Sequence, residues 1–131
     1  MLPRLILLFL LLPSLAFSES YTQQSIGNND YVSGTNGYSG TGQQIGSFYY
    51  FNDNQGNSYT TQSIGNFQYT TGSNGYSATE QSIGNFNYLN DNSGNSFTNQ
   101  AIGNFDYTNG SNGYSGTGQE IGNSYYYNDN Q

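Results

Sequence analysis

The chain repeats one 19-residue unit without an insertion or a deletion. An Ile-Gly pair returns at the same place in every unit, and the third copy of the surrounding motif reads QSIGNFQY over residues 62–69. When the Gln is counted as position 1, position 3 is always Ile, position 4 is always Gly and position 8 is always Tyr. A period of this length is typical of a repeat architecture in which every unit is one supersecondary element.

A second period, twice as long, lies on top of the first. Alternate units carry GTNGYSGTG, GSNGYSATE and GSNGYSGTG at 34–42, 72–80 and 110–118, whereas the units between them carry NDNQGNSYT and NDNSGNSFT at 52–60 and 90–98. Duplication of a two-unit segment explains both periods.

The first 18 residues have the features of a secretory signal peptide. Arg4 precedes an apolar run from Leu5 to Leu12, and the small residues Ala16 and Ser18 follow it where a signal peptidase would cut. We therefore predict a signal peptide at 1–18, a lead-in at 19–23 and six tandem repeats over 24–131, the last incomplete. We expect the protein to be secreted, in the extracellular space or at the cell surface.

Composition excludes several classes of function. Without Arg4 the chain has no basic residue, no His and no Cys, but it keeps eight acidic residues. Nucleic acids and anionic membranes are poor partners for such a chain, because both bind through cations on the protein. A serine nucleophile would lack a His or Lys base, so we expect no enzyme activity and no cofactor.

The alternation of residues sorts the side chains onto two faces. If Gly65 and Asn66 form a tight turn, Ile64 faces Phe67 and Gln62 faces Tyr69 on one side of a sheet. All near-invariant side chains then share that face, and the variable ones share the other. The Asn-Gly dipeptides at 36–37, 74–75 and 112–113 predict the bends at the opposite end.

These signals predict an all-β fold, with two architectures open. In the first, each unit is one rung of a β-solenoid of about six 19-residue rungs, and identical side chains stack about 4.8 Å apart. In the second, each unit is a hairpin, and the hairpins follow one another as a meander or spiral. Strict equality of unit length favours the solenoid, because stacked identical residues require it.

The solenoid interpretation assigns a role to each set of aromatic and aliphatic residues. The near-invariant face would be interior and form a structural ladder, and the variable face would be outside and free for contacts. The ladder comprises Ile26, Ile45, Ile64, Ile83, Ile102, Ile121, Phe48, Phe67, Phe86, Phe105, Tyr50, Tyr69, Tyr88 and Tyr107. The expected outer-face contacts are Tyr38, Tyr59, Tyr76, Phe97 and Tyr114.

The sequence contains few residues that could form a metal or ligand site. Zinc and copper lack His and Cys ligands, and we predict no metal site. Calcium could find oxygen ligands in the segments 52–54 and 90–92, but these fit no EF-hand or β-roll calcium pattern, and an ordinary Asx-rich turn explains them better. A recurring Ser-x-Thr pair, such as Ser58 and Thr60, resembles the Thr-x-Thr rows of ice-binding proteins.

The repeat resembles the curlin repeats of bacterial curli fibres, a functional amyloid. Ser58, Gln62, Gly65 and Asn66 match a shortened version of the curlin pattern, in a chain that is likewise acidic, cysteine-free and rich in Gly, Asn, Gln, Ser and Tyr. The resemblance implies an extracellular, self-assembling matrix or adhesive subunit.

Two function hypotheses follow. The first is a secreted structural or adhesive protein that self-associates through open β edges, since neither end of the repeat array carries a recognisable cap. The second is a monomeric surface-binding module for carbohydrate or ice that uses the exposed aromatic residues or the Ser/Thr row.

Overall fold

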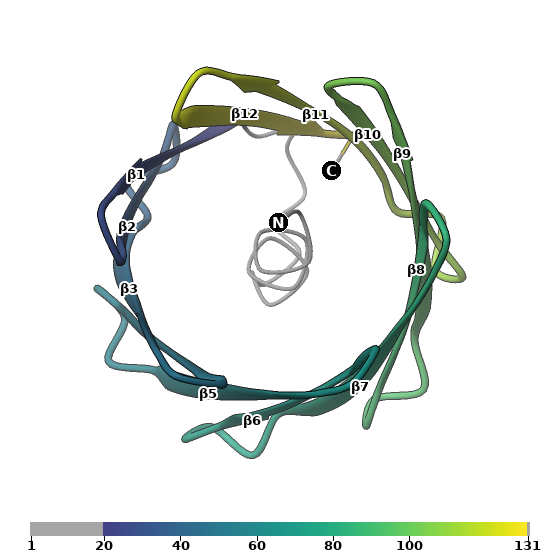
Figure 1. The fold of residues 1–131 in the computed structure, drawn as a ribbon, viewed down its shortest axis with the longest axis horizontal. Helices are drawn as coiled ribbons and strands as arrows, with labels where there is room; N and C mark the ends of the chain where they lie inside the picture. Colours follow the sequence, from purple (N-terminus) through teal and green to yellow (C-terminus); the bar gives the residue numbers. More distant parts are fainter. Residues whose placement is uncertain (1–19, 131) are drawn as a thin grey trace.

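The computed structural model describes residues 20–130, which form an all-β fold, as the sequence predicts (Figure 1). The predicted signal peptide and Glu19 lie outside the described residues. The strands are β1 (Ser20–Ile26), β2 (Asn29–Gly34), β3 (Ser39–Ile45), β4 (Phe48–Asp53), β5 (Ser58–Ile64), β6 (Phe67–Gly72), β7 (Ser77–Ile83), β8 (Phe86–Asp91), β9 (Ser96–Ile102), β10 (Phe105–Gly110), β11 (Ser115–Ile121) and β12 (Ser124–Asp129).

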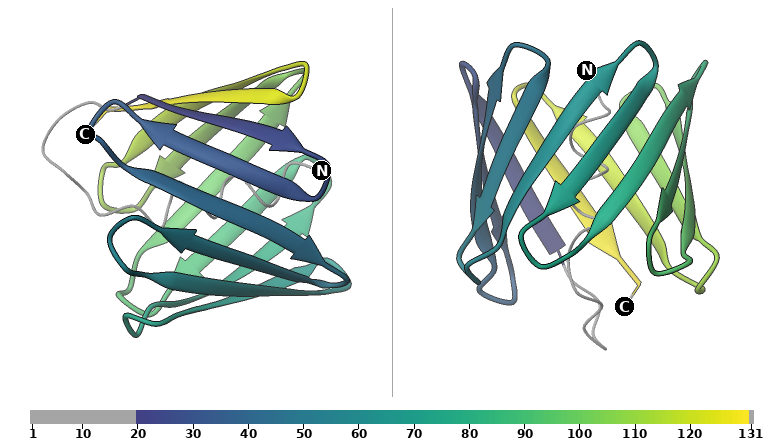
Figure 2. Two further views of the ribbon diagram at one scale, coloured as in Figure 1. Left: turned by 90° about the vertical axis from the view of Figure 1, so that its left-hand side faces the viewer. Right: turned by 90° about the horizontal axis from the view of Figure 1, so that it is seen from below.

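The strands form a closed antiparallel barrel rather than a solenoid. Each strand pairs with its neighbours in sequence, and β1 pairs with β12 to complete the ring. Figure 2 shows the strands tilted relative to the barrel axis, as closure of a sheet requires. The expected solenoid of six rungs is therefore wrong. The chain does run as consecutive hairpins, the second architecture considered above, but that expectation did not include closure.

The solenoid prediction failed because the Gly-Asn turn reverses the chain instead of bending it into a rung. Gly65 has a φ of +63°, and the described residues include no non-glycine residue with positive φ. This places Gly at the first central position of a two-residue turn, which is the arrangement of a type II′ hairpin. The predicted register is confirmed, since Ile64 lies opposite Phe67 and Gln62 opposite Tyr69.

The other end of each hairpin has a longer loop that also depends on glycine. The Gly34 amide donates to the Tyr38 carbonyl at 2.9 Å across a three-residue loop, and Gly37 has a φ of +84°. A glycine with positive φ in the last loop position matches the three-residue hairpin that ends in a bulge. The Asn-Gly bends predicted from the sequence are confirmed here.

The pair that closes the barrel repeats the interactions of the internal pairs. Residues 20–23, expected to be a lead-in, form the first half of β1, and Ser20 lies opposite Asn128. Ser58 lies opposite Asn52 in the same way, and its hydroxyl donates to the Asn52 side-chain oxygen at 2.7 Å. The Ser20 hydroxyl donates to Asn128 in the equivalent bond. The lead-in and the last repeat therefore meet as two halves of one repeat unit.

The variable positions, not the near-invariant ones, face the inside of the barrel. The buried apolar residues form two clusters on this face, the larger around Tyr21, Phe51 and Tyr59 and the smaller around Leu89 and Phe97. The sequence correctly separates two sets of side chains, but the assignment of the near-invariant set to the interior is wrong. On the concave inner face, side chains of neighbouring strands must fit one another, and residues of different size provide this fit.

On the inner face, a large side chain on one strand packs beside a small residue on the neighbouring strand. A Cβ atom added to Gly40 would overlap the ring of Phe51, so this ring depends on the absence of a side chain on the adjacent strand. The equivalent positions two units later hold Ala78 and Leu89, a larger residue facing a smaller one. Further along the strand of Gly40, Gly42 faces the Tyr49 side chain, and the equivalent residues are Glu80 and Asn87.

We expect Gly40→Ala to destabilise the barrel by about 1–3 kcal/mol, because the added methyl group overpacks the inner face. Phe51→Leu in the same chain should recover part of this loss, because it recreates the Ala78–Leu89 pair. Urea unfolding of the single and double variants measures the coupling. Phe97→Leu is the matched control, since its ring lies over Gly110, and its effect should add to that of Gly40→Ala. Additive effects for Gly40→Ala and Phe51→Leu would contradict the size-complementarity argument.

Candidate functional site

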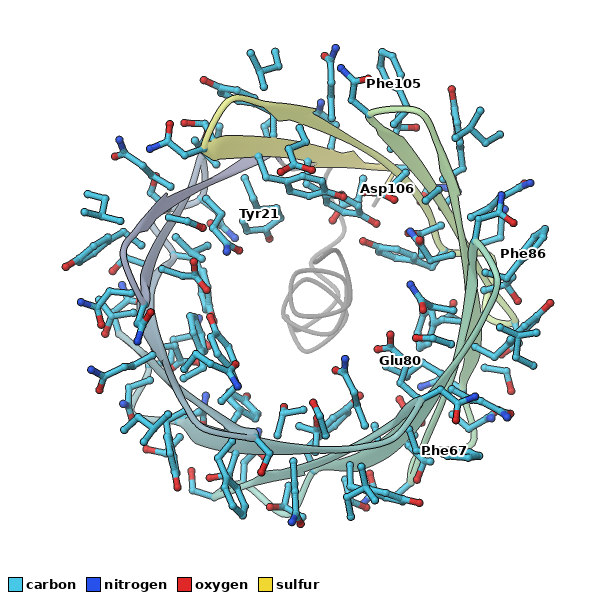
Figure 3. All side chains as sticks on the ribbon, viewed as in Figure 1. Tyr21, Phe67, Glu80, Phe86, Phe105 and Asp106 are labelled. Carbon is cyan, nitrogen blue, oxygen red and sulfur yellow. The ribbon has the colours of Figure 1, made fainter. Side chains whose placement is uncertain are left out.

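The predicted ladder residues form a ring on the outside of the barrel, at the end that carries the Gly-Asn turns. The six Ile side chains are 53–57% exposed, and the position-8 tyrosines are 40–46% exposed. Phe48 and Phe105 are exposed, while Phe67 and Phe86 are half-buried. Figure 3 shows the labelled Phe67, Phe86 and Phe105 pointing outward. We call this ring the girdle; it comprises Ile26, Ile45, Ile64, Ile83, Ile102, Ile121, Phe48, Phe67, Phe86, Phe105, Tyr31, Tyr50, Tyr69, Tyr88, Tyr107 and Tyr126.

Aromatic rings within the girdle are arranged in matched pairs. The Phe48–Tyr50 and Phe67–Tyr69 centroids are 6.2 Å and 6.3 Å apart, and both pairs have an interplanar angle of 19°. The pair on β8 repeats this geometry. Successive outward positions on one strand place the rings side by side. The girdle therefore presents similar aromatic pairs from three adjacent hairpins.

The residues expected to make outer-face contacts lie inside the barrel instead. Tyr38, Tyr59 and Phe97 are buried, and Tyr76 and Tyr114 pack against the core while partly exposed. Tyr59 and Tyr76 form an edge-to-face pair with centroids 6.4 Å apart, an arrangement that aromatic packing favours. The structure assigns these five residues to packing.

The acidic residues are concentrated on the opposite face from the girdle. All seven that the structure describes occupy positions with the same parity as the buried inner side chains. They are Asp30, Asp53, Glu80, Asp91, Asp106, Glu120 and Asp129. No basic residue occurs after Arg4, so this charge has no counter-ion within residues 20–130. The outward-pointing strand positions in that range carry no charge.

Two of the buried carboxylates are held by tyrosines of the next repeat. The Tyr49 hydroxyl donates to Asp30 Oδ2 at 2.8 Å, and the Tyr125 hydroxyl donates to Asp106 Oδ2 at 3.1 Å. Ser25 also donates to Asp30. Each tyrosine follows its aspartate by one full repeat unit, so the repeat itself produces these pairs.

Glu80 differs from these carboxylates because neither of its oxygens has a hydrogen-bond partner. Its side chain is 1% exposed, and it lies between Gln68 on β6 and Leu89 on β8. Figure 3 shows it pointing into the barrel from β7. An unpaired buried carboxylate is costly in its charged form, so it takes up a proton or binds a donor from outside the chain.

Burial changes the protonation of the inner carboxylates. Loss of contact with water raises the pKa of Glu80 to about 8. Burial also raises the pKa of Asp106, although the hydrogen bond from Tyr125 lowers it in part. Glu80 therefore holds its proton in the folded protein at pH values where the unfolded chain has lost it.

The segments considered for calcium contain carboxylates that serve their own turns. Asp53 Oδ1 accepts the Gln55 and Asn57 amides at 2.9 Å each, and Asp91 accepts the equivalent bonds from Ser93 and Asn95. Residues 20–130 contain no group of three acidic side chains close enough to hold a metal ion. These aspartates therefore act as turn residues.

The surface has two hollows, of about 310 and 350 Å³, at places that are two repeat units apart in the sequence. One is lined by Thr108, Gly116 and Asp129 among others, and the other by the equivalent residues two units earlier, Thr70, Ala78 and Asp91. Neither lining includes Glu80. The unpaired carboxyl group therefore lies apart from both hollows.

No family model, curated protein or solved structure matches this chain. Among residues 20–130, no helix has the length and apolar character needed to cross a membrane.

Sequence reasoning missed Glu80 as a distinctive residue. The sequence does mark Glu80 by a departure from the repeat: residues 78–80 read ATE, whereas the equivalent residues 40–42 and 116–118 read GTG. The predicted ladder residues do share one face, but the sequence assigned this face to the interior and did not include Tyr31 and Tyr126 in the ladder.

We expect the free energy of unfolding to fall as the pH rises from about 4.5 to about 8, because only the unfolded chain releases the Glu80 proton in this range. One group of this kind contributes a slope of about 1.4 kcal/mol per pH unit. Urea titrations at pH 5 and pH 8.5 measure it. Glu80→Gln should reduce this slope, and the raised pKa of Asp106 should account for the slope that remains.

Glu120→Gln is the matched control, because Glu120 is an exposed glutamate on the same face of the sheet. It should keep most of the pH dependence. Equal slopes for the original chain and Glu80→Gln would contradict the burial of an unpaired Glu80 carboxyl group.

Proposed function

We propose that this protein is a secreted structural or adhesive protein whose barrels associate with one another through the girdle. The observation that carries the proposal is the ring of six isoleucines, each more than half exposed, on the outside of a closed barrel. Monomeric soluble proteins rarely expose large contiguous apolar patches, and such patches usually mark a binding surface. Burial of this surface would contribute about 25 cal/mol to the free energy of association for each Å² of apolar surface removed from water.

The repeat favours a second copy of the chain as the partner. Each of the six hairpins presents its Ile and Tyr at the same place, and the four central ones add a Phe, so the girdle repeats the same apolar surface around the ring. A second barrel offers a surface with the same repeat, so one sector of each girdle can form an isologous contact with the other.

The distribution of charge supports contact between copies. Although the chain is acidic, the acidic side chains of residues 20–130 share the inner parity and leave the outer strand positions neutral. Two outer faces can therefore approach without desolvating charged groups, which is a major cost of burying polar surface.

The mode of association differs from the one expected from the sequence. In residues 20–130 every strand has two paired neighbours, so the open edges needed for stacking by strand addition are absent. The resemblance to curlin repeats still supports an extracellular assembly role, with face-to-face contact as its mechanism.

We expect the mass of the purified protein in sedimentation velocity to rise with concentration over a hundredfold range. The variant Ile64→Asp/Ile83→Asp should associate more weakly than the original chain, because it places charge in two of the six hairpins. It should keep its far-UV circular dichroism spectrum, because these exposed side chains contribute little to the core. The matched control is Ser33→Asp/Thr71→Asp, with the same added charge at exposed outer positions whose cross-strand partners lie outside the girdle. It should still associate.

A protein that stays monomeric over the whole concentration range would contradict the proposal. So would equal dissociation in both double variants, because association would then depend on the neutrality of the whole outer face rather than on the girdle.

Carbohydrate binding is a second candidate, favoured by the parallel Phe–Tyr pairs of the girdle. Sugar rings stack on exposed aromatic faces, and the three matched pairs offer the same surface at regular intervals. Retention of a monomeric protein on an insoluble polysaccharide, weakened in Phe67→Ala/Tyr69→Ala, would favour this candidate over self-association.

A further inference from the structure

We propose that the inner face of the barrel binds a linear oligoamine, with Glu80 as the main anchor for one of its ammonium groups. This inference concerns the face opposite the girdle and does not depend on the proposed function.

The charge of the inner face selects for cations. Asp30, Glu80 and Asp106 are all buried there, while residues 20–130 contain no Lys, Arg or His. A concave, low-dielectric surface lined by one sign of charge concentrates ligands of the opposite sign. Twelve strands also enclose a wider interior than eight, the number at which side chains alone fill a barrel.

The unpaired polar atoms on this face nearly all need a hydrogen-bond donor. Both Glu80 carboxylate oxygens, Asp106 Oδ1, Asn99 Oδ1 and Gln23 Oε1 are buried without a partner. The Tyr76 hydroxyl is the sixth such atom in the part of the chain described. Buried acceptors are normally satisfied, and a donor-rich ligand would satisfy these. An ammonium group supplies three donors and no acceptor.

The unpaired acceptors are distributed around the wall rather than gathered at one point. Glu80 lies on β7, Asn99 on β9 and Asp106 on β10, and Figure 3 shows Glu80 and Asp106 on separated parts of the inner wall. No three carboxylates within residues 20–130 converge on one metal position. A flexible chain with several ammonium groups can reach separated acceptors, whereas a single metal ion cannot.

The aromatic side chains on the same face would strengthen this recognition. Phe51, Tyr59 and Phe97 are buried on the inner face, and Tyr76 packs against them. An ammonium group near an aromatic face gains a cation–π interaction that is larger where water is excluded. The methylene segments of an oligoamine would contact the same rings.

Isothermal titration of the full-length protein with the tetraamine spermine in 150 mM NaCl tests the proposal. We expect saturable binding with one spermine per barrel, and at least tenfold weaker binding by Glu80→Gln. That substitution keeps the side-chain shape and removes the carboxyl group, which would release its proton and become a carboxylate when an ammonium group binds. Glu120→Gln removes an equal charge from an exposed position and should change the affinity by less than about threefold, since exposed charges are screened by salt.

The absence of saturable binding would overturn the proposal. Equal weakening by Glu80→Gln and Glu120→Gln would also overturn it, because the affinity would then report net charge only. Binding of MgCl₂ as tightly as spermine, at equal charge concentration, would exclude recognition of an extended amine. Far-UV circular dichroism would check that both variants are folded, and Glu80→Gln adds no charge to the core that could prevent folding.

Discussion

The pairing of β1 with β12 is the interaction on which the rest of the structure depends. It places Ser20 opposite Asn128 with the same register and the same side-chain hydrogen bond that join Ser58 to Asn52. This pairing removes the two sheet edges that a linear array of hairpins would leave exposed. It also creates a concave inner face and a convex outer face, which then have different requirements for side chains.

These two requirements explain why one face is nearly invariant and the other is not. On the outer face each residue meets water and its immediate neighbours, so the same Ile and Tyr serve in every hairpin. On the inner face Gly40 accommodates Phe51, while Ala78 and Leu89 share the equivalent space. Glu80 stands where Gly42 makes room for the Tyr49 side chain two units earlier, and Asn87 replaces Tyr49 beside it. The unpaired carboxyl group is thus a consequence of the way in which a larger residue on one strand is balanced by a smaller residue on the next.

Local structure could be predicted from the sequence, whereas the inside and outside of the fold could not. The turn at Gly65, the opposition of Ile64 and Phe67 and the separation of two faces follow from dipeptide chemistry and alternation. Alternation does not indicate which face is concave, and apolar character wrongly favoured the Ile face. Closure had a signal in the repeat itself: residues 20–23 read SYTQ, matching SYTT at 58–61. This match shows that the lead-in is half of a unit, but only pairing in space identifies its other half.

The separation of Ser20 and Asn128 by 108 residues makes closure the most non-local step in forming the fold. The other strand pairs join neighbours in sequence and form through short loops, so they face a smaller entropic barrier. Until β1 meets β12, the chain is a curved sheet with two complementary bare edges. Those edges can meet within one molecule or between two, and the choice depends on the effective concentration of one end around the other. The same repeat that lets the barrel close therefore links the yield of closed monomers to the protein concentration during folding.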